Sequence, residues 1–317
     1  MQEGGLAGYA TCMTIQWFPG HMAKAKRLIT TLLPKVDVVI ELRDARVPAA
    51  SQNPLIDEII GDTPRVVVLN KTDLADPRIT RLWLKSFQSE ASDAVEVDSM
   101  TGRGVPALMN RSVELVSRVR KQRGQRPLER AARAMIVGIP NVGKSSLINR
   151  MAQKKIARTG DQPAITKKEQ WVRLSPKLHL LDTPGMLWHK FEDQEIGKAL
   201  AACGCIKEAI LNPVEIATFI VTKVDELYPE AVNRRFKLKD DEREDIVERI
   251  GRKRGCLISG GGVDLTKAAG IICREFRGGQ LGRCSLEDPQ HLIQSPPEAV
   301  LDNPESHPLT SDEEAND

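Results

Sequence analysis

The chain has 317 residues, of which 41% are hydrophobic and 28% are charged, so it is long enough for two domains with packed cores. No apolar run approaches the roughly 20 residues that a membrane-spanning helix needs, and we expect no membrane partner. Residues 1–12 lack the basic and apolar regions of a signal peptide, so we expect a flexible leader, with Met13 as an alternative start. The six cysteines form no C-x-x-C pair, which fits packing in a reducing cytoplasm better than a metal site.

Charge is unevenly distributed along the chain. The net charge is +3, but nine of the 43 acidic residues and no Lys or Arg lie in residues 284–317, which leaves +12 on the first 283 residues. This stretch also holds five prolines, and we expect a disordered acidic tail. A basic body with an acidic tail is typical of a protein with a polyanionic partner, although a solvated charged surface would give the same composition.

The first predicted elements are an extended lead-in over residues 14–22, an amphipathic helix over residues 22–33 and a strand over residues 36–42. The polar side of this helix carries three basic residues, Lys24, Lys26 and Arg27. A loop over residues 43–48 then leaves the strand.

A second buried strand is predicted over residues 64–69, because this stretch is rich in β-branched residues. It ends in Asn70-Lys71-Thr72-Asp73, which matches the N-K-x-D motif. A carboxylate at Asp73 can accept hydrogen bonds from N1–H and N2–H₂ of guanine, which adenine does not offer, while Asn70 and Lys71 would steady the loop and cover the base. The motif is weak alone but strong at the carboxyl end of a strand, in a chain that also has a phosphate loop.

Residues 95–102 are expected to form a further short strand and turn. They fit an accessory guanine loop made by Asp98, Ser99 and Met100, in which a backbone N–H near Met100 would meet the carbonyl of the base. The pattern is weak by itself, and it gains weight only from the guanine motif before it.

The central motif is Gly138-Ile-Pro-Asn-Val-Gly-Lys-Ser145, a complete G-x-x-x-x-G-K-S phosphate-binding loop. It lies between residues 134–137, an apolar predicted strand, and residues 146–151, which have helical spacing, and the motif requires this context. Its backbone N–H groups would cradle an anion, Lys144 would reach the β- and γ-phosphates, and the Ser145 hydroxyl would bind Mg²⁺. The nucleotide contacts expected from this segment are Asn141, Val142, Gly143, Lys144, Ser145 and Ser146.

Two later segments are expected to complete the phosphate and metal site. Residues 162–166 are a candidate switch, in which the Thr166 hydroxyl would coordinate Mg²⁺. Residues 178–182 are predicted to form a strand that ends in a D-x-x-G motif. Asp182 of that motif would act on Mg²⁺ through water, and the Gly185 N–H would contact the γ-phosphate.

The order of the motifs differs from that of a conventional GTPase, in which the phosphate loop comes first. Here Asn70–Asp73 precedes it. A competing match, Thr222-Lys-Val-Asp225, would restore the usual order, but apolar residues recur around it at helical spacing after Asn212-Pro213, a good helix start. We therefore predict an α/β fold: a circularly permuted P-loop GTPase domain, with a mostly parallel sheet and helices on both faces, followed by a small all-α domain.

The expected domains are a leader, a permuted GTPase domain, a C-terminal helical domain that contacts RNA, and a tail, over residues 1–12, 13–188, 189–283 and 284–317. Because D-x-x-G comes last in the GTPase domain, the chain runs from the γ-phosphate sensor directly into the helical domain. Nucleotide state could therefore reorient that domain.

The sequence resembles the ribosome biogenesis GTPase A family, bacterial circularly permuted GTPases that help to mature the large ribosomal subunit. The resemblance runs from about Met13 to Glu287. It includes the opening segment 14–25, the nucleotide motifs described above, and Lys253-Arg-Gly-Cys-Leu257. It implies slow hydrolysis of GTP with Mg²⁺ by a cytoplasmic monomer, stimulated by ribosomal particles, with rRNA and precursors of the 50S subunit as partners.

The resemblance also implies two catalytic features. His21 is implied as the residue that positions the attacking water, because Met186 stands where many GTPases have Gln; packing or capping of the first helix is the alternative. Asn141 is implied as a ligand of K⁺ beside the phosphates. The chain departs from the family pattern with Ala164 in place of Gly and Ser146 in place of Thr.

Three other functions are considered from the sequence. A GTPase switch in tRNA or other RNA modification stays open as the main alternative. A metabolic phosphotransferase is opposed by Asn70–Asp73. An RNA-binding scaffold with vestigial nucleotide binding is opposed by the intact Lys144, Ser145, Thr166 and Asp182.

Overall fold

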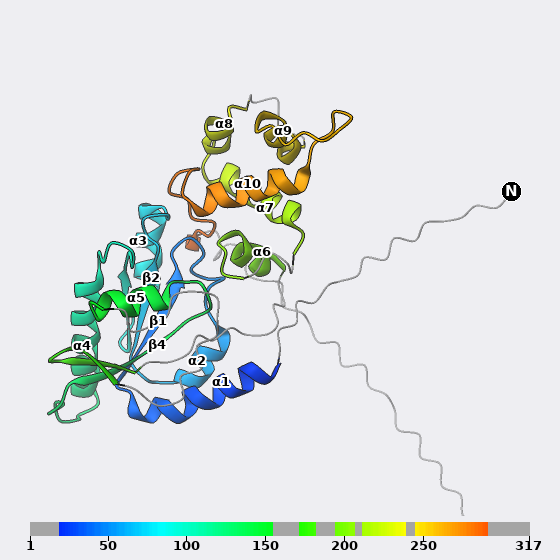
Figure 1. Ribbon diagram of the computed structural model, residues 1–317. Helices are drawn as coiled ribbons and strands as arrows, with labels where there is room; N and C mark the ends of the chain where they lie inside the picture. Colours follow the sequence, from blue (N-terminus) through cyan, green and yellow to red (C-terminus); the bar gives the residue numbers. More distant parts are fainter. Residues whose placement is uncertain (1–18, 155–170, 182–193, 207–210, 239–244, 291–317) are drawn as a thin grey trace, which may run out of the picture.

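The protein forms an α/β sheet domain with a group of helices lying against it (Figure 1). The computed structural model describes residues 19–154, 171–181, 194–206, 211–238 and 245–290, with side chains from Lys26 onward. The predicted leader lies outside the described residues, as does the predicted boundary at residue 188, so both stay predictions. In the described part of the chain, no helix is both long and apolar enough to cross a membrane.

The described strands form one six-stranded sheet in the order β3-β2-β1-β4-β6-β5. Their bounds are Val38–Asp44 (β1), Arg65–Asn70 (β2), Ser92–Glu96 (β3), Ala132–Val137 (β4), Trp171–Ser175 (β5) and Leu178–Leu181 (β6). Neighbouring strands are parallel, except that β5 pairs antiparallel with β6. The mostly parallel sheet is as predicted. The loops that follow β1, β2, β3 and β4 therefore meet at one edge of the sheet.

Helices cover both faces of the sheet. They are α1 (Pro19–Leu32), α2 (Pro54–Ile60), α3 (Pro77–Ser86), α4 (Val105–Gln122) and α5 (Lys144–Met151), and a short 3₁₀ turn, η1, spans Leu33–Lys35. Successive residues of β1 point to opposite faces of the sheet. Ile40 and Leu42 pack on one face with residues of α4 and α5, and Val39 packs on the other face with residues of α1 and α2. On the second face, α3 packs against β2.

Local sequence sets several of the helix starts. Three of the helices that begin with proline are α2, α3 and the later α7, and proline suits the first helical position because no N–H is needed there. The residue before each proline accepts a hydrogen bond from the second backbone N–H of the helix. These capping residues are Asn53, Asp76 and Asn212.

Several elements differ from the sequence prediction. Strand β1 extends to Asp44, so the predicted loop over residues 43–48 begins inside the strand, and β3 begins at Ser92, ahead of the strand predicted within residues 95–102. The first helix begins at Pro19, so the end of the expected lead-in over residues 14–22 is helical rather than extended. Proline is favoured at the first position of a helix, so Pro19 can begin α1. The prediction used only the spacing of apolar residues, which begins later in the helix. Strand β5 was not predicted, because it is an edge strand with a single buried residue and shows no clear alternation.

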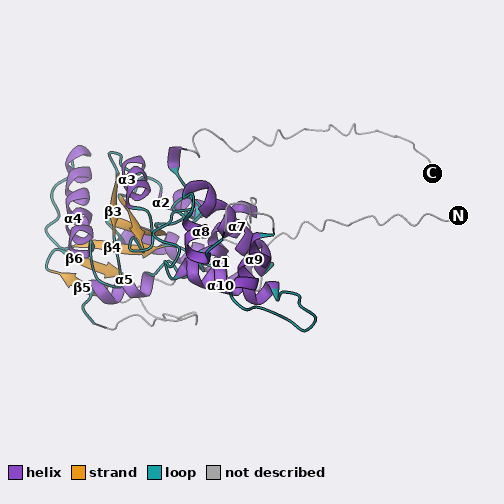
Figure 2. Cartoon of the chain, turned by 90° about the horizontal axis from the view of Figure 1, so that it is seen from above, coloured by secondary structure: helices purple, strands orange, loops and turns teal. Residues whose placement is uncertain are grey.

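The helical group comprises α6 (Gln194–Ala202), α7 (Pro213–Leu227), α8 (Ala231–Phe236), α9 (Ile246–Lys253) and α10 (Leu265–Arg277) among the described residues. Helix α7 is central, because it packs against the other four. The competing motif match Thr222–Asp225 lies inside α7, as the apolar spacing predicted, so it is not a loop at a strand end. Figure 2 shows α7 to α10 gathered at one side of the molecule and the strands with α4 at the other.

After α10 the chain returns to the sheet domain. Cys284 and Leu286 are buried, and their N–H groups donate to the carbonyl oxygens of Leu74, at 3.1 Å, and Arg46, at 2.8 Å. Residues 284–290, which the composition assigned to a disordered tail, are therefore part of the folded structure. Composition failed here because two of the acidic residues, Glu287 and Asp288, bind the sheet domain rather than solvent.

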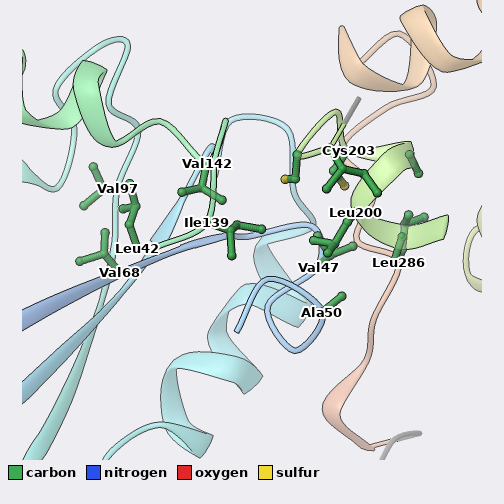
Figure 3. Packing of buried hydrophobic residues seen from close by; sticks show 14 of the residues in the cluster. Leu42, Val47, Ala50, Val68, Val97, Ile139, Val142, Leu200, Cys203 and Leu286 are labelled. Carbon is green, nitrogen blue, oxygen red and sulfur yellow. The ribbon is translucent and has the colours of Figure 1, made fainter. Parts of the chain in front are cut away.

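One buried apolar cluster runs from the sheet into the helical group. Figure 3 shows Leu200 and Cys203, at the end of α6, beside Val47 and Ile139 of the sheet domain, with Leu286 nearby. The helical group is thus packed on the edge of the sheet where the motif loops lie.

Candidate nucleotide-binding site

Three motif loops meet at the carboxyl edge of the sheet, and one buried side chain joins them. Asn70, the last residue of β2, donates from Nδ2 to the Val142 carbonyl oxygen at 2.7 Å. Its Oδ1 accepts the Ser99 N–H at 3.1 Å. The structure therefore brings together the guanine motif, the accessory guanine loop and the phosphate loop, which the sequence predicted as parts of one site.

The phosphate loop has a backbone that requires its glycines. Gly138 and Gly143 have φ values of 152° and 102°. A Cβ at Gly138 would lie 2.5 Å from the Leu42 carbonyl oxygen, and one at Gly143 would lie 2.3 Å from Asn70 Nδ2. Both contacts are too short for any side chain, so the close approach of the loop to β1 and β2 depends on glycine. The loop leads straight into α5, whose N-terminus favours an anion.

Lys144 is folded over the phosphate loop. Its Nζ donates to the carbonyl oxygens of Gly138, at 2.7 Å, and Ile139, at 2.5 Å. Burial lowers the pKa of Lys144 to about 7, because it disfavours the charged amine. A phosphate group beside this amine would favour the charged form again. Ser145 and Ser146 follow in the first turn of α5 and are half-buried.

A buried ion network holds Lys71, the second residue of the guanine motif. Lys71 has a φ of 61°, and its Nζ lies 3.0 Å from Asp44 Oδ2. Arg46 donates to both oxygens of the same carboxylate, at 2.9 and 2.8 Å. Burial alone would raise the pKa of Asp44, but the charges of Arg46 and Lys71 outweigh it and hold the pKa well below its usual range. The network fixes the Lys71 side chain against β1, and its predicted role beside the base stays a prediction.

Asp44 and Arg46 were missed from the sequence as site residues. Their segment was assigned only as a loop after the first strand. The signal available was a pair of opposite charges at the end of a fully buried strand, since Asp44 is the last residue of β1 and Arg46 follows two positions later.

The guanine side of the site has an exposed carboxylate and a capped turn. Asp73 is exposed at the end of its motif. Asp98 accepts the N–H groups of Met100, at 2.9 Å, and Thr101, at 3.2 Å, and the Thr101 hydroxyl at 2.6 Å. The Met100 N–H is therefore engaged by Asp98, and its predicted contact with the base carbonyl stays a prediction. Burial would raise the pKa of Asp98, but these hydrogen bonds lower it.

Two further arginines that the sequence did not single out hold these loops. Arg150 of α5 donates from Nε to the Ser99 carbonyl oxygen at 3.5 Å, and also donates to the Met100 carbonyl oxygen. Arg103 donates to the Thr72 hydroxyl at 3.2 Å. Each arginine is far along the chain from the loop that it contacts, and no local sequence pattern relates the two. These contacts are therefore visible only in the folded structure.

The remaining predicted site residues are described only in part. Thr166, Asp182 and Gly185 lie outside the described residues, and so does the side chain of His21, whose backbone belongs to α1. Within the described residues, no group of three or more His, Cys, Asp or Glu side chains could hold a metal ion. The Ser145 hydroxyl, next to Lys144 at the start of α5, fits a Mg²⁺ ion carried in with nucleotide phosphates.

These features define the class of protein. A phosphate loop on β4, a guanine motif on a parallel strand that comes earlier in the chain, and one side chain that joins them are the features of a circularly permuted GTPase. Residues 133–254 match the family described as "50S ribosome-binding GTPase". Over 289 residues, the chain is 48% identical to Ribosome biogenesis GTPase A of Priestia megaterium, which covers 89% of this chain and 99% of that protein. The chain belongs to the ribosome biogenesis GTPase A family.

More distant relatives and solved structures agree. Ribosome biogenesis GTPase A of Thermotoga maritima is 32% identical over 278 residues, covering 88% of this chain and 96% of that protein. A GDP-bound structure of TM YlqF is similar with a TM-score of 0.59 and 28% identity, over 83% of this chain and 100% of that one. The GNP-bound structure of YlqF from T. maritima also has a TM-score of 0.59, over 84% of this chain and 99% of that one. The predictions of a permuted GTPase fold and of GTP hydrolysis are confirmed.

Proposed function

We propose that this GTPase binds rRNA in precursors of the large ribosomal subunit and promotes late maturation of the 50S subunit, acting as a cytoplasmic monomer. The observation that carries the proposal is a GTPase site in a chain that is 48% identical, over nearly its full length, to a protein named for ribosome biogenesis. The family description of residues 133–254 as 50S ribosome-binding supports the choice of the large subunit.

The charge of the chain supports an RNA partner. The first 283 residues carry +12, and Arg234 and Lys237 are exposed beside α8. Two nearby basic residues are held closely by acidic side chains: Arg235 Nε lies 2.8 Å from Glu275, and Lys26 Nζ lies 2.8 Å from Glu58. Arg234 has only a looser contact, in which its Nη2 lies 3.9 Å from Glu230 and both side chains are exposed. We therefore assign Arg234 and Lys237 the larger share of RNA binding in the helical group.

We further propose roles for the site residues. Asp73 selects guanine, Lys144 holds the β- and γ-phosphates, and Ser145 binds Mg²⁺ together with Thr166 and Asp182. Bound Mg²⁺ would neutralise the developing phosphate charge. Val142, Gly143, Ser146 and Gly185 add contacts to the phosphates.

Two catalytic proposals concern water and charge. His21 positions the attacking water, and His21→Ala should slow single-turnover hydrolysis without weakening GTP binding; unaltered hydrolysis would remove it from the mechanism. Asn141, exposed with a φ of 56°, ligates K⁺ beside the phosphates. Hydrolysis that runs equally fast in K⁺ and in Na⁺ would contradict that role.

The central test measures binding to isolated large subunits with GDP and with a non-hydrolysable GTP analogue. A GTPase that switches assembly should bind at least about ten-fold more tightly with the analogue. Equal affinities would contradict the proposal. Depletion followed by sedimentation of ribosomal particles should reveal precursors of the large subunit. Copurification with an RNA-modifying enzyme rather than with such precursors would favour the alternative role in RNA modification.

A further inference from the structure

A short segment after α10 lies across the loops of the nucleotide site. We name residues 281–288 the C-terminal strap. It carries three buried apolar side chains, Leu281, Cys284 and Leu286, and belongs to the same core cluster as the sheet. No nucleotide motif falls in this segment, and neither the fold nor GTP hydrolysis explains why it crosses this edge of the sheet.

The strap binds the loop that carries Asp73. Arg283 donates from Nη2 to the Thr72 carbonyl oxygen at 2.6 Å and from Nε to the Ala75 carbonyl oxygen at 3.0 Å. The Cys284 N–H donates to the Leu74 carbonyl oxygen at 3.1 Å. Strap hydrogen bonds therefore hold the backbone on both sides of Asp73, the residue proposed to recognise guanine.

The strap is itself anchored on the loop that follows β1. The Leu286 N–H donates to the Arg46 carbonyl oxygen at 2.8 Å. The Glu287 carboxylate accepts the N–H groups of Ala49, at 2.6 Å, and Ala50, at 2.9 Å. Trp83 of α3 donates from Nε1 to the Glu287 carbonyl oxygen at 3.1 Å. These contacts fix the strap on the sheet domain, so that it can hold the loop that carries Asp73 in one position.

We propose that the C-terminal strap positions the guanine-recognition loop, with Arg283 as the positioning residue that aligns Asp73 with the base. The proposal rests on the proposed role of Asp73. An exposed carboxylate on a loop must be held in place to accept two hydrogen bonds from the same base edge. One planar guanidinium bound to two carbonyl oxygens fixes the distance between them, which an ammonium group does less well.

The test compares GDP with inosine diphosphate, which lacks the 2-amino group and so leaves Asp73 one hydrogen bond instead of two. The folded full-length chain should bind GDP about ten-fold more tightly than inosine diphosphate. For Arg283→Ala, GDP affinity should fall about five-fold and the preference for GDP should fall at least about two-fold. A purely structural role for Arg283 would weaken both nucleotides equally and leave the preference unchanged.

Three matched variants separate the outcomes. Arg274→Ala removes an exposed arginine of α10 and should keep both affinities. Arg283→Lys should fall between the original protein and Arg283→Ala in its preference for GDP. Asp73→Ala should abolish the preference.

Two results overturn the proposal in distinguishable ways. If Asp73→Ala abolishes the preference for GDP but Arg283→Ala keeps it, the strap does not position the loop. If Asp73→Ala keeps the preference, Asp73 is not the guanine-recognition residue, and both the proposed function of that residue and the positioning role of the strap are wrong.

Discussion

Single buried side chains decide how the motif loops of this GTPase meet. Asn70 is fully buried and bonds to two other loops, while Asp44 holds Lys71 through a buried ion pair. Buried polar groups of this kind are costly to leave without partners, so the loops are fixed relative to one another before any nucleotide binds. Preorganisation at this scale is what allows a few exposed groups, such as Asp73, to recognise the ligand.

Replacing Asn70 should therefore weaken both folding and binding. Asn70→Ala leaves the Val142 carbonyl and the Ser99 N–H buried without this partner, and we expect a loss of about 1–3 kcal/mol in the free energy of unfolding. GDP affinity should fall in parallel. Urea unfolding and GDP titration measure the two effects. Asn110→Ala, at an exposed site on α4, is the control, and similar behaviour of the two variants would contradict this role.

The pKa of Lys144 predicts proton uptake on nucleotide binding. Burial lowers this pKa to about 7, so at pH 8 the free protein holds mostly the neutral amine. Phosphate groups favour the charged amine, so GDP binding at pH 8 should take up as much as about one proton, and affinity should fall as pH rises above 7. Calorimetry in buffers of different ionisation enthalpy measures the uptake. Lys144→Arg, which stays charged, should show none of it, and equal uptake would contradict the assignment.

At the scale of elements, the flanking structure decides what a motif can do. Asn70–Asp73 and Thr222–Asp225 share the same pattern, but the first follows a buried strand and the second lies within α7. A helix keeps its backbone N–H and C=O groups bonded internally and leaves no loop that could wrap a base. The secondary structure around each match therefore shows which of the two segments can bind guanine, although both fit the same sequence pattern.

This choice gives a direct prediction about guanine binding. Asp73→Ala should lower GTP affinity about 100-fold, because two hydrogen bonds to a charged group are lost. Asp225→Ala, the matched variant on α7, should bind GTP normally. Competition between GTP and ATP, measured for both variants, checks the result. Loss of GTP binding in Asp225→Ala alone would reverse the assignment.

At the scale of the whole molecule, the helical group is tied to the sheet domain at both ends. At its start, Arg46 donates from Nη2 to the Cys203 carbonyl oxygen at 3.1 Å, after α6. At its end, the C-terminal strap holds the guanine loop. The predicted reorientation of residues 190–283 by nucleotide state would have to break the buried Arg46 contact or release the strap. Domain movement and guanine binding would then be coupled, each affecting the other.

The acidic tail provides a prediction for the whole molecule. Deleting residues 291–317 removes all but Glu287 and Asp288 of the nine terminal acidic residues and spares the strap. We expect tighter non-specific RNA binding, because the tail would compete with RNA for the basic surface. Binding measured against salt concentration should show the largest gain at low salt. A deletion that starts at Glu287 is not a suitable test, because the Glu287 carboxylate binds Ala49 and Ala50.

The sequence alone determined the class of protein and the main motifs. The phosphate loop, the guanine motif and the strands before them are local patterns, in which backbone conformation depends on neighbouring residues. The order of these motifs along the chain was sufficient to predict the permuted fold. The exposed Asp73 and the half-buried Lys144 and Ser145 needed no structure to be chosen.

Only the tertiary structure decided which residues support that site. Asn70 and Val142 are 72 positions apart, and Arg283 and Thr72 are 211 apart, so neither pair belongs to any periodic pattern. The acidic composition of residues 284–290 pointed to disorder, but a carboxylate on two backbone N–H groups and buried apolar neighbours outweigh that tendency. Such contacts form only when the fold brings distant segments together, and so the strap became visible only in the folded chain.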